Sequence, residues 1–187
     1  MTNDLQYMLE QGYQQHMEGQ LEQAERLYRA VLAQDRDNIH ALNLLGMLCV
    51  NDFRPDEAVV LISKALKFQP NNPESHANLA LAFKDQGKLE SAVKHFRESI
   101  RLDPYRPVVF NNLGNVLRES GKPQEAITAY ERALQLDADF SQAWCKLAAA
   151  LKLSHIHISE PTRPRLVSRM PASPLKYRAG RGGGGGG

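Results

Sequence analysis

The sequence has little cysteine, no long apolar run and no secretory leader pattern. Its two cysteines, Cys49 and Cys145, lie far apart, so we predict small buried side chains rather than a disulfide or a metal pair. No apolar run is long enough to cross a bilayer. The N-terminus, residues 1–4, is polar and acidic and lacks the basic and apolar segments of a secretory signal. These absences predict a cytoplasmic protein without a membrane partner.

An excess of charge of one sign is also missing from most of the chain. The formal net charge of the 187 residues is +2. Residues 154–187 carry six basic side chains and one acid, which is +5, so residues 1–153 have a net charge of −3. The basic excess therefore belongs to the C-terminal segment, and charge gives no support for nucleic-acid binding by the rest.

Sequence motifs of catalysis and of metal or cofactor binding are absent. The sequence has no phosphate-binding glycine loop and no nucleophile motif. His155 and His157 stand two residues apart without a third ligand, which is weak evidence for a metal. Paired acids such as Asp56 and Glu57 suit the first turn of a helix, where they favour the macrodipole. We therefore predict no enzymatic activity, no cofactor and no metal.

What the sequence does contain is a repeat of 34 residues. Four rows of residues keep this step. They are an alanine row (Ala24, Ala58, Ala92, Ala126), a leucine row (Leu45, Leu79, Leu113, Leu147), a small-residue row (Gly12, Gly46, Ala80, Gly114, Ala148) and a bulky row (Tyr28, Ile62, Phe96, Tyr130). The step divides the chain into repeats 5–38, 39–72, 73–106 and 107–140, followed by the half repeat 141–152.

Each repeat is predicted to form two helices, as the fourth repeat illustrates. Pro107 suits the first turn of the first helix, because its missing N–H needs no partner there. Gly121 ends that helix in a left-handed conformation, and Pro123 begins the second helix. Gly114 lets the two helices approach closely, and Tyr130 fills the space toward the next hairpin. One hairpin cannot bury both of its faces, so at least about three must stack.

This pattern resembles the tetratricopeptide repeat over residues 5–152. The resemblance implies an all-α fold, an α-solenoid of antiparallel helical hairpins wound into a right-handed superhelix. Repeats three and four also contain the strings Asn-Leu-Ala at 78–80 and Asn-Leu-Gly at 112–114. These strings look like the repeats that precede the catalytic region of O-linked N-acetylglucosamine transferases. Bacterial proteins that join such repeats to sulfotransferase or methyltransferase domains look similar too.

Three repeats depart from the pattern, the fourth only because Ala138 replaces its closing proline. In repeat one, Gln11 and Gln15 occupy positions that are usually apolar, which suits a polar N-terminal cap. In repeat two, Phe53 stands where the other full repeats have glycine. A left-handed Phe would cost about 1 kcal/mol or more. We therefore expect Asn51 or Asp52 to take the left-handed conformation instead.

Beyond Lys152 the repeat pattern stops. The segment 153–163 resembles the translation of a transposase-type sequencing adapter, and the chain ends in a glycine run at 182–187. Three prolines in between forbid a continuous helix. We predict that residues 153–187 are a disordered, non-native tail and that the natural gene was cut inside its fifth repeat. A natural disordered basic tail is the alternative.

The resemblance implies that the first helix of each repeat lines a concave side where a partner binds. The residues expected there are Asn43, Met47, Asn78, Leu81, Lys84, Asn112, Asn115, Arg118 and Lys146. Asn78 and Asn112 share one repeat position and match asparagines that, in the transferase-like family, hold the backbone of an extended peptide. Hydrogen bonds to a neighbouring helix or to water would explain both asparagines as well.

The predicted function is that of a scaffold that binds a protein or peptide on this concave face. The alternative is the N-terminal substrate-recruiting region of a larger glycosyl-, sulfo- or methyltransferase. The sequence leaves the identity of the partner and the oligomeric state open.

Overall fold

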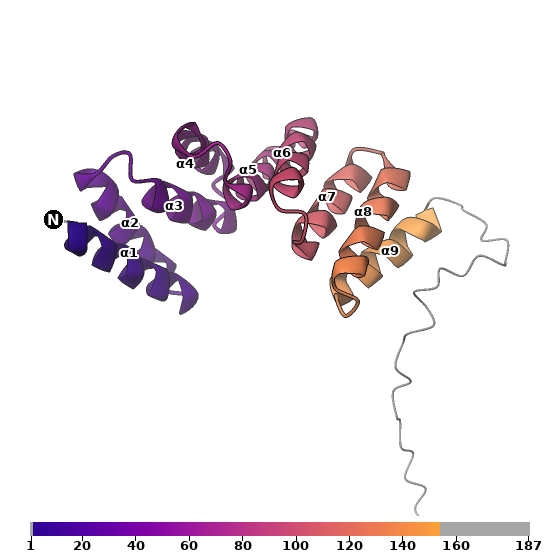
Figure 1. The fold of residues 1–187 in the computed structure, drawn as a ribbon, viewed down its shortest axis with the longest axis horizontal. Coiled ribbons are helices and arrows are strands. Elements are labelled where there is room, and N and C mark those ends of the chain that lie inside the picture. The colour runs from indigo at the N-terminus through magenta and orange to yellow at the C-terminus, as the bar shows by residue number, and fades with distance from the viewer. Residues whose placement is uncertain (1, 154–187) are drawn as a thin grey trace, which may run out of the picture. The chain divides into compact units, whose positions relative to one another are not determined.

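The computed structural model describes residues 2–153, which form nine α-helices and no strand (Figure 1). The helices are α1 (Thr2–Met17), α2 (Leu21–Gln34), α3 (Ile39–Asn51), α4 (Pro55–Phe68), α5 (Pro73–Asp85), α6 (Leu89–Leu102), α7 (Pro107–Glu119), α8 (Pro123–Leu136) and α9 (Ser141–Leu153). The predicted all-α array of helical hairpins is thereby confirmed. The predicted non-native tail, with His155 and His157, lies outside the described residues from residue 154 onward.

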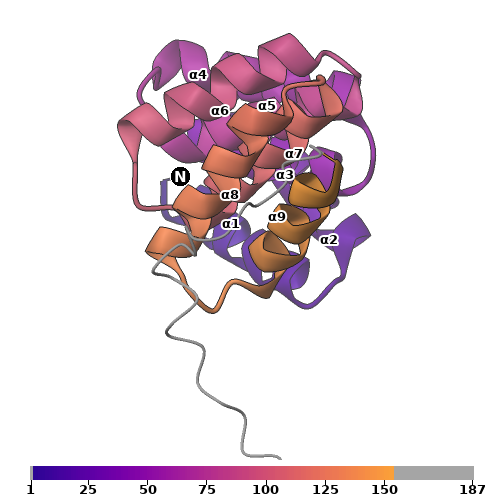
Figure 2. The same cartoon turned by 90° about the vertical axis from the view of Figure 1, so that its right-hand side faces the viewer.

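Each helix packs against the next one along the chain. Four hairpins result, α1–α2, α3–α4, α5–α6 and α7–α8, and the second helix of each also contacts the first helix that follows. The last described helix, α9, packs on α8 and faces the viewer in Figure 2. First helices also touch one another directly, α1 with α3, α3 with α5 and α7 with α9. Faces of α1, α3 and α5 thus lie next to one another.

Proline, asparagine and glycine set the ends of the helices. Proline is the first residue of α4, α5, α7 and α8, where its missing N–H is not needed. The side chains of Asn38 and Asn72 cap α3 and α5 by accepting backbone N–H groups of the first turn. After α1, α5 and α7 the chain turns at Gly19, Gly87 and Gly121, whose φ values of 79°, 72° and 74° are the left-handed conformation predicted for them.

The expectation for the turn of the second hairpin is wrong. Phe53 itself takes the left-handed conformation, with φ of 53°, whereas Asn51 is helical and Asp52 has φ of −94°. Arg54 N donates to Cys49 O at 2.8 Å, and the same backbone bond closes the turns after α1, α5 and α7. Packing of α3 against α4 requires the common turn geometry, and the Phe53 ring is left 83% exposed.

Replacing Phe53 with glycine is expected to raise the free energy of unfolding by about 1 kcal/mol, because glycine adopts positive φ without the contact between Cβ and the backbone. The change removes no buried surface, since the ring is exposed. Urea unfolding followed by circular dichroism measures it. Phe53→Ala is the control, since alanine keeps the Cβ and should leave stability nearly unchanged. A Phe53→Gly variant no more stable than Phe53→Ala would contradict the strain argument.

The bulky row of the second helices forms the centre of the core, and each of its members, Tyr28, Ile62, Phe96 and Tyr130, is fully buried. The small-residue row of the first helices lies directly against it. A Cβ atom on Gly114, for example, would lie only 2.6 Å from Cε1 of Tyr130. The core consists of two clusters that both contact Leu81 and Phe83 of α5. The rows predicted from the 34-residue step are therefore the rows that pack.

The last helix is covered on one side within the described residues. Ala143, Leu147 and Ala150 of α9 are buried, whereas Ala148, which belongs to the small-residue row, is exposed. No second helix of a fifth hairpin lies in the range 2–153 to cover Ala148. Cys145 of α9 is exposed, so the prediction that both cysteines are buried is wrong for this residue. Cys49 is buried, and both cysteines are free thiols.

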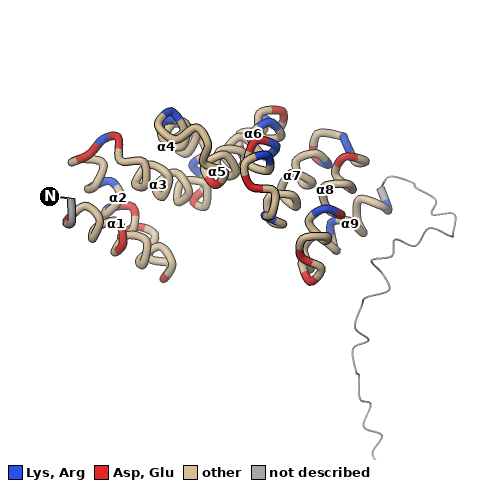
Figure 3. Tube along the Cα trace, viewed as in Figure 1, with Lys and Arg blue, Asp and Glu red and all other residues tan. Residues whose placement is uncertain are grey.

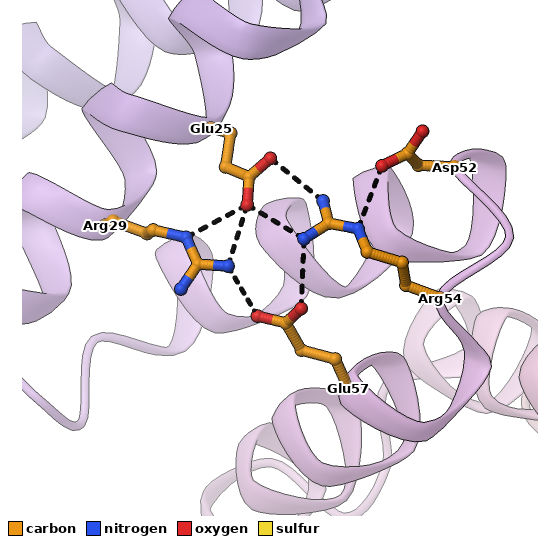
Figure 4. A network of polar contacts seen from close by, with 5 residues as sticks. All are labelled: Glu25, Arg29, Asp52, Arg54 and Glu57. Carbon is orange, nitrogen blue, oxygen red and sulfur yellow. Dashed lines mark hydrogen bonds and ion pairs between the residues drawn. The ribbon is translucent and has the colours of Figure 1, made fainter.

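An ion-pair network joins the second helices of the first two hairpins (Figure 4). Glu25 of α2 accepts hydrogen bonds from Arg29 and from Arg54, the latter with Nη2 2.9 Å from Oε2. Glu57 of α4 contacts the same two arginines, at 2.7 Å and 3.0 Å, and Asp52 pairs with Arg54 Nε at 2.9 Å. The hydrogen bond from Arg54 lowers the pKa of Glu25, against the opposing effect of burial. The acids of this region are thus paired with cations.

Candidate functional site: a groove along α1, α3 and α5

Two adjoining cavities lie along the first helices of the first three hairpins. The larger, of about 810 Å³, is lined by α1, α3 and the loop before α3, and the smaller, of about 500 Å³, continues to α5. Tyr13, Met17, His40 and Leu44 line both cavities, so the two form one channel, which we call the inner groove. Its other lining residues are Leu5, Gln6, Leu9, Glu10, Gln14, Glu18, Asp35 and Asn38 toward α1, and Asn43, Met47, Asn72, Glu74, Ser75 and Asn78 toward α5.

The floor of the inner groove at α1 is an apolar stripe. Leu5, Leu9, Tyr13 and Met17 are four residues apart, so they lie on one face of the helix. Two of them are open to solvent, Tyr13 with 49% and Met17 with 70% of its surface exposed. Met47, one 34-residue step after Tyr13, continues the stripe on α3. A contiguous apolar surface of this kind marks a binding site more often than a chance exposure.

Hydrogen bonds hold the start of α5, which forms the far wall of the groove. Asn72 Oδ1 accepts the backbone N–H groups of Glu74 and Ser75, both at 3.0 Å. Ser75 Oγ donates to Asn43 Oδ1 at 2.7 Å. This second bond connects α5 directly to α3, so the wall and the floor of the groove keep a defined spacing.

Two histidines form a stacked pair behind this wall, between α5 and α6. His76 Nδ1 lies 3.0 Å from His95 Nδ1, and His76 Nε2 lies 3.0 Å from the carbonyl oxygen of Pro70. Because a carbonyl only accepts, His76 Nε2 carries a proton, its Nδ1 accepts, and His95 Nδ1 donates. With both rings neutral, the two hydrogen bonds of His76 are satisfied. Burial lowers the pKa of His95, reinforced by His76 and Lys94 and opposed by Glu98.

Lowering the pH from 7.5 to 5.0 is expected to destabilise the array partly through His95. Its pKa in the folded protein lies below the ordinary value of 6.5, so the unfolded chain binds more protons and stability falls as the pH drops past that value. His95→Leu should flatten the decline of the melting temperature over this range, since Leu27 and Leu61 hold the same repeat position. Burial lowers the pKa of His16 too, so part of the slope should remain. An unchanged slope would exclude His95 as a source.

Three of the predicted partner-binding residues line the inner groove, namely Asn43, Met47 and Asn78. The amide of Asn43 is engaged, because its oxygen accepts from Ser75. Asn78 is half-buried, and its side chain has no hydrogen bond to another group of the described residues. Of the two predicted ladder asparagines, Asn78 therefore presents an open donor and acceptor to the groove.

The two other predicted residues of α5 lie outside the groove lining. Leu81 is partly buried and packs against both core clusters. Lys84 Nζ lies 3.4 Å from Asp85 Oδ1. Leu81 thus contributes to the core, and Lys84 has the carboxylate of Asp85 beside it on the same helix.

The predicted residues of α7 and α9 also lie outside the groove lining. Asn115 Oδ1 accepts the hydroxyl of Tyr130 at 3.0 Å. Burial raises the pKa of Tyr130, and the nearby guanidinium of Arg118 opposes that rise. Asn112 is half-buried and Lys146 exposed. The structure therefore separates the nine predicted residues into three at the groove and six beyond it.

The apolar side chains of α1 line the groove, and they are absent from the residues predicted from the sequence. A signal for them exists, because Tyr13 precedes Met47 by one 34-residue step and Met47 is among the predicted residues. The polar residues Gln11 and Gln15 obscure this signal by indicating a cap. Both lie on a half-buried side of α1 and do not line the groove.

The groove offers an apolar floor, carboxylates at its edge and an amide on its α5 wall. Such a surface can bury apolar side chains of a partner and hydrogen-bond its polar groups. Within residues 2–153 no three His, Cys, Asp or Glu side chains gather to hold a metal ion. In the same range every helix is too short or too polar to cross a bilayer.

Three models of known repeat families match this chain. A model described as "Tetratricopeptide repeat" matches residues 15–82, a second with that description matches residues 73–106, and one described as "TPR repeat" matches residues 114–154. Together the three matches cover more than half of the 187 residues.

Solved structures of similar fold include three whose descriptions are informative. The MamA protein is 22% identical with a TM-score of 0.72, over 81% of this chain and 83% of that chain. PilF of Pseudomonas aeruginosa is 24% identical with a TM-score of 0.74, over 82% and 70%. YrrB, described as a TPR protein with an unusual peptide-binding site, is 19% identical with a TM-score of 0.66, over 72% and 69%. At these identities the likeness concerns the fold.

Proposed function

We propose that this chain, which belongs to the tetratricopeptide-repeat family, binds a segment of a partner protein in its inner groove. The family and the fold support a protein-interaction scaffold, and proteins of this family are generally non-enzymatic. The observation that carries the proposal is the uncovered apolar stripe of α1, continued on α3, inside a groove that reaches α5. Water leaves this surface when a partner covers it, which favours association.

Of the predicted residues beyond the groove, Asn112 extends the proposed site from Asn78 toward α7. Asn78 and Asn112 occupy the same repeat position, and neither amide has a hydrogen bond to another described residue. Each can therefore offer a donor and an acceptor to the backbone of an extended segment. In this arrangement the groove holds apolar side chains, and the asparagines hold the main chain.

Selection of random peptides on the folded chain, followed by anisotropy titrations, tests the proposal. The Tyr13→Gln, Met17→Gln variant should bind the selected peptides at least about tenfold more weakly, because it removes exposed apolar surface from the groove. The matched control is Val60→Gln with Phe68→Gln, which removes side chains that are 68% and 51% exposed on α4.

Equal losses in the two variants, or none in the groove variant, would remove the groove from the proposal. Asn78→Ala combined with Asn112→Ala tests the asparagine part separately. We expect weaker binding of the selected peptides, and an unchanged affinity would show that the asparagines do not hold the partner.

A role as the substrate-recruiting region of a larger glycosyl-, sulfo- or methyltransferase stays a prediction. Its support is the resemblance of the strings at 78–80 and 112–114 to the repeats of such enzymes. Sequencing the gene beyond this chain tests it, since a transferase domain in the same reading frame is required.

A further inference from the structure

We propose that the segment held by the inner groove is amphipathic and cationic, with apolar anchors flanked by lysine or arginine. This inference rests on the proposed function and specifies the chemistry of its partner. It follows from the distribution of charge around the groove and from what those charges contact.

Apart from His40, every ionisable side chain with a charge at neutral pH that lines the inner groove is an Asp or a Glu. Glu10, Glu18 and Asp35 lie around the apolar stripe of α1, and Glu74 lies at the α5 wall. Lysine and arginine are absent from the lining of both cavities. The first cation in the sequence other than histidine is Arg26. Figure 3 shows the corresponding pattern, with acids but no Lys or Arg on α1 and neither sign within α3.

The groove acids have no cationic partner within residues 2–153. Glu10 accepts a hydrogen bond from Gln6 at 3.1 Å, and Glu18 accepts one from Gln14 at 2.9 Å. Asp35 accepts from the Asn38 amide at 3.1 Å. All of these donors are neutral amides, so the negative charges around the apolar stripe are uncompensated.

Two acids on the second helices of the same hairpins are in the opposite situation. Glu25 and Glu57 each contact both Arg29 and Arg54 (Figure 4). The first two hairpins therefore neutralise Glu25 and Glu57 with arginines while leaving the groove acids without an ion pair. Asp56 of α4 accepts from the neutral amide of Gln86 and lies outside the groove lining. Carboxylates without an ion pair beside an exposed apolar surface are complementary to a cationic ligand that carries apolar side chains.

An acidic ligand would meet repulsion at the same place. Four carboxylates around the groove would repel the negative charges of such a ligand. Lys84, Arg118 and Lys152 share one repeat position on α5, α7 and α9, but none of them lines the groove. An acidic segment would thus be drawn toward these cations and away from the apolar stripe.

The test uses three labelled peptides of one length. The first carries leucine anchors at alternate positions, the spacing of an extended segment, with flanking lysines. The second replaces each lysine with glutamate, and the third replaces each leucine of the first with serine. Anisotropy titrations use the full chain at about 50 mM and about 500 mM salt. We expect the lysine peptide to bind at least about tenfold more tightly than the glutamate peptide at low salt, with a smaller gap at high salt. The serine peptide should bind weakly at both.

Variants in which carboxylates are replaced by neutral amides show where the preference for the lysine peptide arises. Glu10→Gln, Glu18→Gln and Glu74→Gln together should reduce the preference for the lysine peptide severalfold. The control Glu22→Gln, Glu90→Gln and Asp139→Asn removes the same net charge from exposed positions outside the groove and should preserve the preference. Circular dichroism checks that both variants fold.

Each alternative outcome has a distinct meaning. Equal binding of the lysine and glutamate peptides, tighter binding of the glutamate peptide, or failure of both to bind overturns this inference. So does a preference that falls equally in the groove and control variants. The proposed function survives all of these if peptides selected at random lose affinity in the Tyr13→Gln, Met17→Gln variant. If they do not, the proposed function fails as well.

Discussion

Replacing Phe96 with alanine is expected to lower the free energy of unfolding by about 3–5 kcal/mol. Phe96 is fully buried in α6 and belongs to the core cluster of the C-terminal hairpins. Truncation to alanine removes most of its apolar contacts and leaves a cavity that the surrounding helices can fill only in part. The loss falls in the middle of the array, where α6 packs on both α5 and α7.

Because Phe96 lies in the middle of a repeat array, its truncation should also change the shape of the unfolding transition. Stability in such an array is close to a sum of hairpin and interface terms, so weakening a central hairpin uncouples the two ends. We expect Phe96→Ala to unfold in a broader urea transition than the parent chain. Phe68→Ala is the control, since Phe68 is 51% exposed at the end of α4 and should cost about 1 kcal/mol or less. Equal effects of the two substitutions would contradict the assignment of Phe96 to the core.

Gly114→Val is expected to cost about 3 kcal/mol, at the upper end for overpacking of a core. A Cβ atom at this position would lie 2.6 Å from Cε1 and 2.9 Å from Cζ of Tyr130. The ring cannot easily move away, because it is fully buried and its hydroxyl donates to Asn115. The substitution must therefore push α7 away from α8, and thermal or urea unfolding measures the result.

Ala148→Val is the matched control for this substitution. Ala148 holds the same repeat position on α9 but is exposed, because no second helix packs on it within the described residues. Its branched side chain would meet solvent, and the expected cost is about 0.5 kcal/mol from the lower helix propensity of valine. If Gly114→Val were as mild as Ala148→Val, the close approach of α7 and α8 would not limit the residue at position 114.

The core of this protein could be predicted because its rows recur. Tyr28, Ile62, Phe96 and Tyr130 each lie one 34-residue step apart, and a residue that is buried by one hairpin is buried by every equivalent hairpin. The glycines after α1, α5 and α7 could also be predicted. Glycine adopts a left-handed backbone without steric cost, so it is favoured at turns where no side chain is needed for packing. Both signals are local or periodic.

The groove could not be predicted in this way. Leu5, Leu9, Tyr13 and Met17 have the spacing of a core stripe, and spacing alone does not tell a core face from an exposed binding face. What separates them is the presence or absence of a covering helix. Ala148 shows the same limit, because its repeat position suggests burial and the missing neighbour leaves it exposed.

The sequence by itself determined the helices, their hairpin pairing and the rows of the core, since helix periodicity, terminal residues and the 34-residue step are all properties of the chain. Tertiary structure alone decided three other matters. It placed Phe53 in a left-handed conformation, because the packing of α3 on α4 outweighs the local cost. It left one apolar stripe of α1 uncovered. It also left the acids beside that stripe without cations while pairing Glu25 and Glu57 with arginines. Burial and charge compensation depend on which surfaces meet in space, and no single segment of sequence contains that information.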